Sequence, residues 1–254
     1  MCRCLPNKSH KTFRIGGSQI PKTFKLKRTI EESSILIKTD LFEAAEAAFQ
    51  NVKKTRNDLK KYSAIHPEFI QTLKPVKIRQ DAPEVVKRMS DAAEKAKVGP
   101  MAAVAGAIAD LAAEEMEKHG AKVIVVEDGG EIAIRRSDKL DVAIYAGGAQ
   151  VSGKLGFRIL QVEVPLGIGT SSATVGHAKS FGSADAATVI ANDAALADAA
   201  ATAVCNGVVG DDLNESVKQG LKVAQSIEGV RGALILRGKS VGMVGHLPKL
   251  IGIK

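Results

Sequence analysis

The chain has 254 residues, of which 45% are hydrophobic and 25% charged, as is ordinary for a soluble protein with a sizeable core. Aromatic residues make up 4% and Trp is absent, so stacking platforms for single-stranded nucleic acid are lacking and no nucleic-acid partner is expected. The formal net charge of +8 resides in residues 1–28, which hold eight Lys and Arg and no Asp or Glu. We therefore expect residues 1–22 to form a basic, partly disordered arm and residues 23–254 a single domain, in one or two lobes. Contact of the arm with a polyanion stays open.

The three cysteines, Cys2, Cys4 and Cys205, do not form a disulfide framework, which favours a reducing compartment. No apolar segment follows the basic start, so we expect no signal peptide. The longest apolar stretch, residues 101–109, is too short to span a bilayer. These observations predict a cytoplasmic protein without a membrane partner. Cys205 is expected in the core, with a reactive thiol as the alternative.

The first half of the chain is predicted to contain two strands followed by helices. Alternating apolar residues indicate strands over 23–29 and 33–39. An apolar stripe over 42–62 indicates a long helix with Asp40 as its expected N-cap. A further helix runs to about residue 97, and Asp81 is its expected N-cap.

In the second half of the chain, strand patterns alternate with helical ones. A helix is indicated over 101–119, an Ala-rich helix carries Asp198 and Thr202, and an amphipathic helix ends near residue 226. The predicted strands cover residues 122–127, 131–135, 141–145, 157–164, 233–236 and 240–244. Because these strands follow one another as a meander while helices cluster in the first half, the sequence predicts an α+β fold with helices packed on a largely antiparallel sheet.

The segment 165–206 is unusually rich in polar side chains set among Gly and Ala. Gly167-Ile-Gly-Thr-Ser-Ser172 is predicted to be a loop whose backbone amides and hydroxyls bind a phosphate or carboxylate, or else a plain cluster of turns. His177 is a candidate general base or phosphate ligand, and Lys179 a candidate source of positive charge. For both, an ordinary polar loop residue is the alternative.

Asp198 and Thr202 lie four residues apart on a predicted helix, so both side chains project from one face. A carboxylate and a hydroxyl are hard oxygen ligands, and Mg²⁺ often takes one protein carboxylate and completes its shell with water and phosphate. The alternative is an exposed Asp198 and a Thr202 that bonds the carbonyl four residues back.

A second acidic group, Glu127-Asp128-Gly129-Gly130-Glu131, forms a predicted hairpin tip. Its three carboxylates suit either a second metal site or a solvated turn. Gly129 and Gly130 would allow a ligand to approach the backbone closely.

Residues 101–110 (Met-Ala-Ala-Val-Ala-Gly-Ala-Ile-Ala-Asp), 125–130 (Val-Val-Glu-Asp-Gly-Gly), 169–172 (Gly-Thr-Ser-Ser) and 197–203 (Ala-Asp-Ala-Ala-Ala-Thr-Ala) occur in this order. Together they resemble the ApbE family, the FAD:protein FMN transferases, and most closely its cytosolic branch in archaea and anaerobic bacteria. The resemblance implies an ApbE-like α+β fold and a homodimer.

The same resemblance assigns roles to individual residues. It implies that Asp198 and Thr202 bind a divalent metal such as Mg²⁺. It places Gly169, Thr170, Ser171 and Ser172 toward a nucleotide, and Gly129 and Gly130 at a close-approach turn. The chain departs from the transferases where His177 is followed by Ala-Lys-Ser-Phe in place of His-x-x-Asp-Pro-x-Thr-Gly, and where Ala105 replaces a Lys. FAD binding therefore stays open.

Three functions remain in view from the sequence. The first is binding of a phosphate-containing ligand, a nucleotide or flavin, with a divalent metal, as in a Mg-dependent transferase. The second is an accessory role in sulfur transfer or homocysteine biosynthesis, with a persulfide on Cys205. The third is a non-catalytic scaffold.

Overall fold

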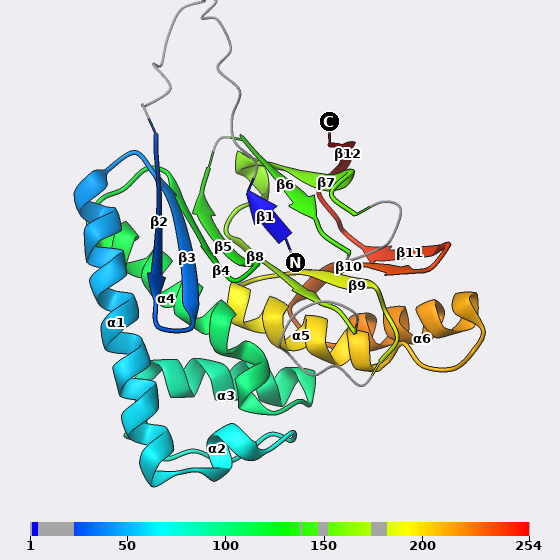
Figure 1. Cartoon of the computed structure of the whole chain (residues 1–254), viewed down its shortest axis with the longest axis horizontal. Helices are drawn as coiled ribbons and strands as arrows, with labels where there is room; N and C mark the ends of the chain where they lie inside the picture. The colour runs from blue at the N-terminus through cyan, green and yellow to red at the C-terminus, as the bar shows by residue number, and fades with distance from the viewer. Residues whose placement is uncertain (1, 5–22, 138, 147–151, 174–181, 254) are drawn as a thin grey trace, which may run out of the picture.

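The computed structural model describes residues 2–4, 23–137, 139–146, 152–173 and 182–253. They form two sheets and a layer of helices, which confirms the predicted α+β fold (Figure 1). The larger sheet contains, in spatial order, β11 (Ser240–Gly245), β10 (Val230–Arg237), β9 (Ala186–Ala191), β8 (Leu166–Ser171), β5 (Glu131–Arg136), β4 (Ile124–Asp128), β3 (Ser33–Thr39) and β2 (Phe24–Ile30). The smaller sheet contains β1 (Cys2–Cys4), β6 (Lys139–Ile144), β7 (Leu155–Leu160) and β12 (Lys249–Gly252). Neighbouring strands in both sheets pair antiparallel.

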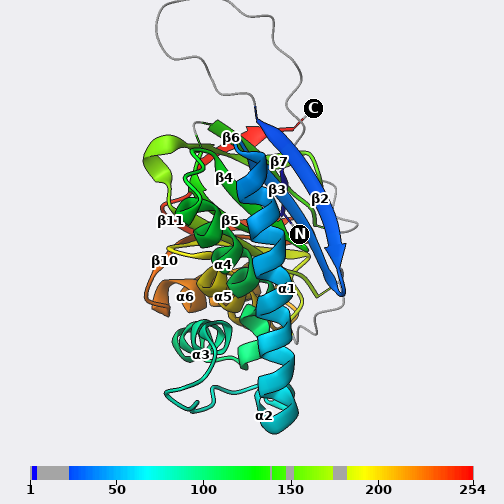
Figure 2. The ribbon, with the colours of Figure 1, turned by 90° about the vertical axis from the view of Figure 1, so that its left-hand side faces the viewer.

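The helices cover the face of the larger sheet that is turned away from the smaller sheet (Figure 1). Figure 2 shows α1 running along this layer, with α2 and α3 toward its far end. The helices are α1 (Phe42–Ile65), α2 (Glu68–Gln71), α3 (Glu84–Ala96), the 3₁₀ turn η1 (Pro100–Ala103), α4 (Val104–Lys118), the 3₁₀ turn η2 (Gln161–Glu163), α5 (Ala194–Asn206) and α6 (Leu213–Ser226).

The central strands of the larger sheet are buried on both faces, which explains their continuous apolar sequences, whereas the outer strands β2 and β11 are partly exposed. In β9, Ala187 and Val189 pack among α3, α5 and α6, whereas Ile190 packs with the smaller sheet. A third group of core residues joins β3 and β4 to α1 and α4. Alternate side chains of a central strand such as β9 therefore enter two different cores, and neither face of the strand is exposed to solvent.

Two predicted helix caps are wrong because their carboxylates bind elsewhere. Asp40 Oδ1 accepts hydrogen bonds from the backbone N–H groups of Lys122 and Val123, each at 2.8 Å, and so ties the start of α1 to the start of β4. Asp81 accepts a hydrogen bond from Arg79 Nε at 2.9 Å. Neither α1 nor α3 has a side-chain cap at its N-terminus: the Asp40 carboxylate binds a distant segment and the Asp81 carboxylate binds a side chain two residues away.

Candidate functional site

Helix α5 packs directly against α4 and the larger sheet. A Cβ on Gly106 of α4 would lie 2.1 Å from the carbonyl oxygen of Ala194. Cβ atoms on Gly167 and Gly169 of β8 would lie 2.1 Å from Asp193 O and 2.5 Å from Ala197 O. Only glycine fits at these three positions, because the backbone of α5 occupies the space a side chain would need.

This packing corrects one site prediction. The segment 167–172 is not a loop: residues 166–171 form β8, hydrogen-bonded between β5 and β9. Thr170 is buried, with its Oγ1 2.9 Å from Thr188 Oγ1. Ser171 is half-buried and Ser172 is buried. The glycines therefore seat a helix, and backbone amides expected to bind a phosphate are in the strand ladder.

Each of α4 and α5 supplies a carboxylate to the first turn of the other. Asp198 Oδ2 accepts a hydrogen bond from Gly106 N at 3.0 Å. Asp110 accepts hydrogen bonds from Ala194 N at 3.1 Å and from Ala195 N at 2.9 Å. These contacts satisfy amides that a helix leaves unpaired, and they place carboxyl oxygens, which accept hydrogen bonds, at the N-terminal ends of both helices. The reciprocal capping fixes where Asp198 lies relative to α4.

The carboxylate of Asp198 lies near two others. Asp128 ends β4, Glu131 begins β5, and both raise the pKa of Asp198 by charge repulsion. Asp198 as a whole residue is half-buried, but its carboxylate is buried. This burial is the main cause of a pKa well above the usual range. Burial also raises the pKa of Glu131 to about 7 and that of Asp128 to about 6. The ionised forms of all three carboxyl groups are therefore disfavoured here, and a bound cation would favour them.

The β4–β5 tip is not a solvated turn. Asp128 is buried, and its Oδ1 accepts a hydrogen bond from Ser34 N at 3.1 Å, while Glu127 is buried as well. Gly129 and Gly130 occupy the tip with φ of +65° and +119°, values that favour glycine. Among the described residues, no group of three or more His, Cys, Asp or Glu is arranged to hold a metal ion. A cation beside Asp198 would therefore need hydroxyl, backbone, water or ligand oxygens.

Thr202 lies one turn along α5 from Asp198 and carries a hydroxyl. It lines a cavity of about 370 Å³ between the last turn of α5, η1 and the segment after α2. The lining residues are Ile70, Thr72, Leu73, Lys97, Val98, Gly99, Met101, Ala102, Thr202 and Asn206. Asp198 faces the start of α4 and Thr202 faces η1, so the pair spans the η1–α4 junction.

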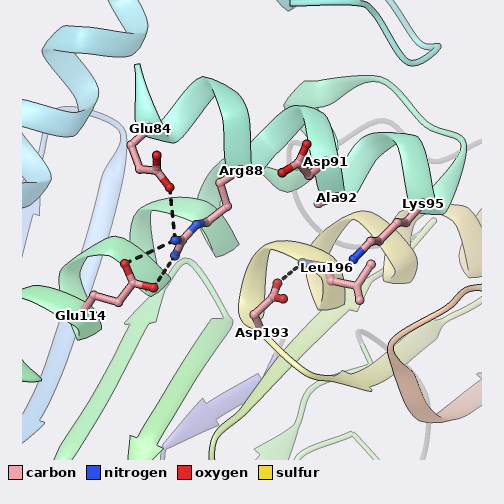
Figure 3. A pocket seen from close by; sticks show the side chains of 8 residues that line it. All are labelled: Glu84, Arg88, Asp91, Ala92, Lys95, Glu114, Asp193 and Leu196. Atoms are coloured by element: carbon pink, nitrogen blue, oxygen red, sulfur yellow. Dashed lines mark hydrogen bonds and ion pairs between the residues drawn. The ribbon is translucent and has the colours of Figure 1, made fainter. Parts of the chain in front are cut away.

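A second cavity of about 270 Å³ lies at the first turn of α5 (Figure 3). Arg88 there donates to Glu114 at 2.8 and 3.3 Å and to Glu84 at 3.5 Å, so its charge is already matched. Four carboxylates and two cations line this cavity: Glu84, Asp91, Glu114, Asp193, Arg88 and Lys95. Its net negative charge disfavours an anionic ligand.

Two site predictions and one cysteine remain to be placed. His177 and Lys179 lie outside the described residues. Cys205 is fully buried in the last turn of α5, as expected for core packing. Sequence reasoning missed Asp110, although a lone acid in the apolar run of α4 was a visible signal. It also missed Lys97, for which no signal stood out.

Within the described part of the chain, no single helix is long and apolar enough to cross a membrane. One bent pair, Glu84–Ala96 with Pro100–Lys118, passes by length and composition alone, and its two halves meet at 104°.

Comparisons with known proteins agree with this architecture. A family model described as "AbpE bacteria" matches residues 18–227. A UPF0280 protein of Methanocaldococcus jannaschii is 40% identical over 230 residues, covering 90% of this chain and 93% of the relative.

Solved structures share the fold. The ApbE protein of Thermotoga maritima matches with a TM-score of 0.59 and 14% identity, over 87% of this chain and 96% of that one. The flavin transferase ApbE of Vibrio cholerae matches with a TM-score of 0.56 and 13% identity, over 91% and 97% of the two chains.

Proposed function

The chain belongs to the ApbE-like family, in the branch of its archaeal UPF0280 relatives, and on this premise we propose that it binds a phosphate-containing ligand together with a divalent metal ion. The ligand is a nucleotide or a flavin. The observation that carries the proposal is that Thr202 lines a cavity one helical turn along α5 from the Asp198 carboxylate.

The cavity has the character of a small-molecule site. Its volume of about 370 Å³ falls in the range of about 300–1,000 Å³ typical of ligand pockets. Apolar side chains form much of its wall, and Thr72, Thr202 and Asn206 add hydrogen-bonding groups. This combination suits a ring system with one polar end. Flavin is the first candidate because structures with this fold are named flavin transferases.

The residues present fit a hard divalent cation. Asp198 offers one carboxylate, with one oxygen engaged by Gly106 N, and Thr202 offers a hydroxyl. Mg²⁺ is commonly held by one or two carboxylates and completes its octahedron with water and substrate phosphates. A cation would also offset the repulsion from Glu131 and Asp128 that raises the pKa of Asp198. The metal would supply a bridge between the protein and the ligand's phosphates.

Calorimetric titration of FAD, FMN and ATP, with and without Mg²⁺, tests the proposal. We expect Mg²⁺-dependent binding that falls at least about tenfold in Asp198→Asn and Thr202→Val, since each removes one cation ligand. Asp110→Asn and Thr55→Val are matched controls, because Asp110 has the same capping role and Thr55 is a helical threonine of α1. Unchanged binding by Asp198→Asn, or no binding by the unmodified protein, would contradict the proposal.

A further inference from the structure

Lys97 has an unusual backbone conformation. It ends α3 with φ 57° and ψ 39°, in the left-handed region, and is one of two non-glycine residues with positive φ among the described residues. Its N–H donates to the carbonyls of Ala93 and Glu94, so the conformation is held by the helix end. Glycine is the usual residue here because it has no Cβ to clash. A lysine at this position carries a conformational cost that glycine would avoid.

Lys97 is exposed and is one of the residues that line the 370 Å³ cavity. Gly99 follows closely, and a Cβ there would lie 2.1 Å from Thr72 O, so the segment after α2 packs tightly on this turn. The cavity wall beside Lys97 is therefore built from packed backbone. Thr202 and Asn206 of α5 line the same cavity.

Among the described residues that line this cavity, Lys97 is the sole charged one. Within the described residues, its ammonium group has no hydrogen-bond or ion-pair partner. By contrast, Arg88 in the second cavity is paired with Glu114 and Glu84. An unpaired cation facing a pocket without carboxylates favours an anionic group on the ligand.

We propose that Lys97 binds a phosphate group of the ligand and makes the cavity selective for the phosphorylated form of a flavin or nucleoside. This inference rests on the proposed function and assigns the anion contact to a residue outside α5. Lys97 at the end of α3 and Thr202 on α5 line the same cavity from two different helices. Glycine at position 97 would avoid the conformational cost, but it would not place a positive charge beside the cavity.

The test compares phosphorylated and unphosphorylated ligands by calorimetry in the presence of Mg²⁺. The pairs are FMN with riboflavin and ATP with adenosine. We expect Lys97→Met to weaken binding of the phosphorylated member at least about tenfold and to leave the unphosphorylated member within about twofold, with Lys97→Arg keeping most of the affinity. Lys95→Met, two residues away and lining the other cavity, is the matched control and should change neither.

Lys97→Gly separates binding from folding. It should raise the midpoint of thermal unfolding, because glycine adopts positive φ freely, while it weakens FMN or ATP as Lys97→Met does. A merely structural lysine would give the higher midpoint without the loss of affinity. If the unmodified protein binds FMN or ATP and Lys97→Met binds equally well, the role of Lys97 is overturned and the proposed function stands. If the unmodified protein binds neither, both are overturned.

Discussion

Helix α5 has a cavity at each end, and the two differ in charge more than in size. The one at its first turn, about 270 Å³, is lined by four carboxylates, with Arg88 already held by Glu114 and Glu84. The one at its last turn, about 370 Å³, is mainly apolar, with Lys97 as its charged residue. Volume alone does not separate the two as ligand sites. The two cavities are distinguished by their balance of charge and by whether their cations are already paired, because a cation held in an ion pair is not available to a ligand.

The largest expected effect comes from disrupting the close contact between α4 and α5. Gly106→Val would push α4 away from α5, since a Cβ there lies 2.1 Å from Ala194 O. We expect a loss of about 4 kcal/mol in the free energy of unfolding, because helix backbone must move. Urea unfolding measures it. Gly252→Ala is the control, since a Cβ there meets nothing within 4 Å, and should change stability by about 0.5 kcal/mol or less. Equal stability of the two variants would show that the α4–α5 contact is loose.

A smaller expected effect is the pH dependence of the free energy of unfolding. Burial raises the pKa of Asp110 to about 7, above its unfolded value, so its contribution to stability is present at low pH and lost as pH rises through about 7. We expect the unfolding free energy of the unmodified protein to fall between pH 5 and 8, with Asp110 supplying about 3 kcal/mol of that fall. Asp110→Asn should flatten the slope, as measured by urea unfolding at several pH values. An unchanged slope would assign the pH dependence to Asp198, Asp128 and Glu131, whose pKa values are raised as well.

The smallest expected effect on stability comes from removing the N-cap of α5, which lies at the acidic cavity. Asp193 caps α5, accepting a hydrogen bond from Leu196 N at 2.8 Å, and lines the acidic cavity. Asp193→Ala should lower stability by about 1 kcal/mol and leave FMN or ATP binding unchanged. Asp212→Ala, which removes the corresponding cap of α6, is the matched control and should behave alike. A change in ligand affinity confined to Asp193→Ala would place a ligand at the first turn of α5, against our assignment.

Some of the candidate site was accessible from the sequence and some was not. The placement of Asp198 and Thr202 on one helix face follows from the helical period, and the structure has both on α5. The segment 167–172 was misread because Gly, Thr and Ser are typical of loops and of tightly packed strands alike. In the structure, Gly167 and Gly169 are required because the backbone of Asp193 and Ala197 occupies the space that a side chain would need. That contact joins distant segments, so no local sequence pattern reveals it.

The sequence by itself determined the α+β class, because strand and helix periods are local properties of apolar spacing. It also determined the Ala-rich helix, because alanine favours helix and permits close packing. Only the tertiary structure decided which carboxylate meets which amide. Asp40 binds a distant backbone amide instead of capping its predicted helix, and Asp110 and Asp198 cap each other's helices, α5 and α4. Asp81 is the local exception, since it binds the side chain of Arg79 two residues away. A buried carboxylate binds whatever donors the fold brings within reach, and contacts between distant segments decide which donors those are.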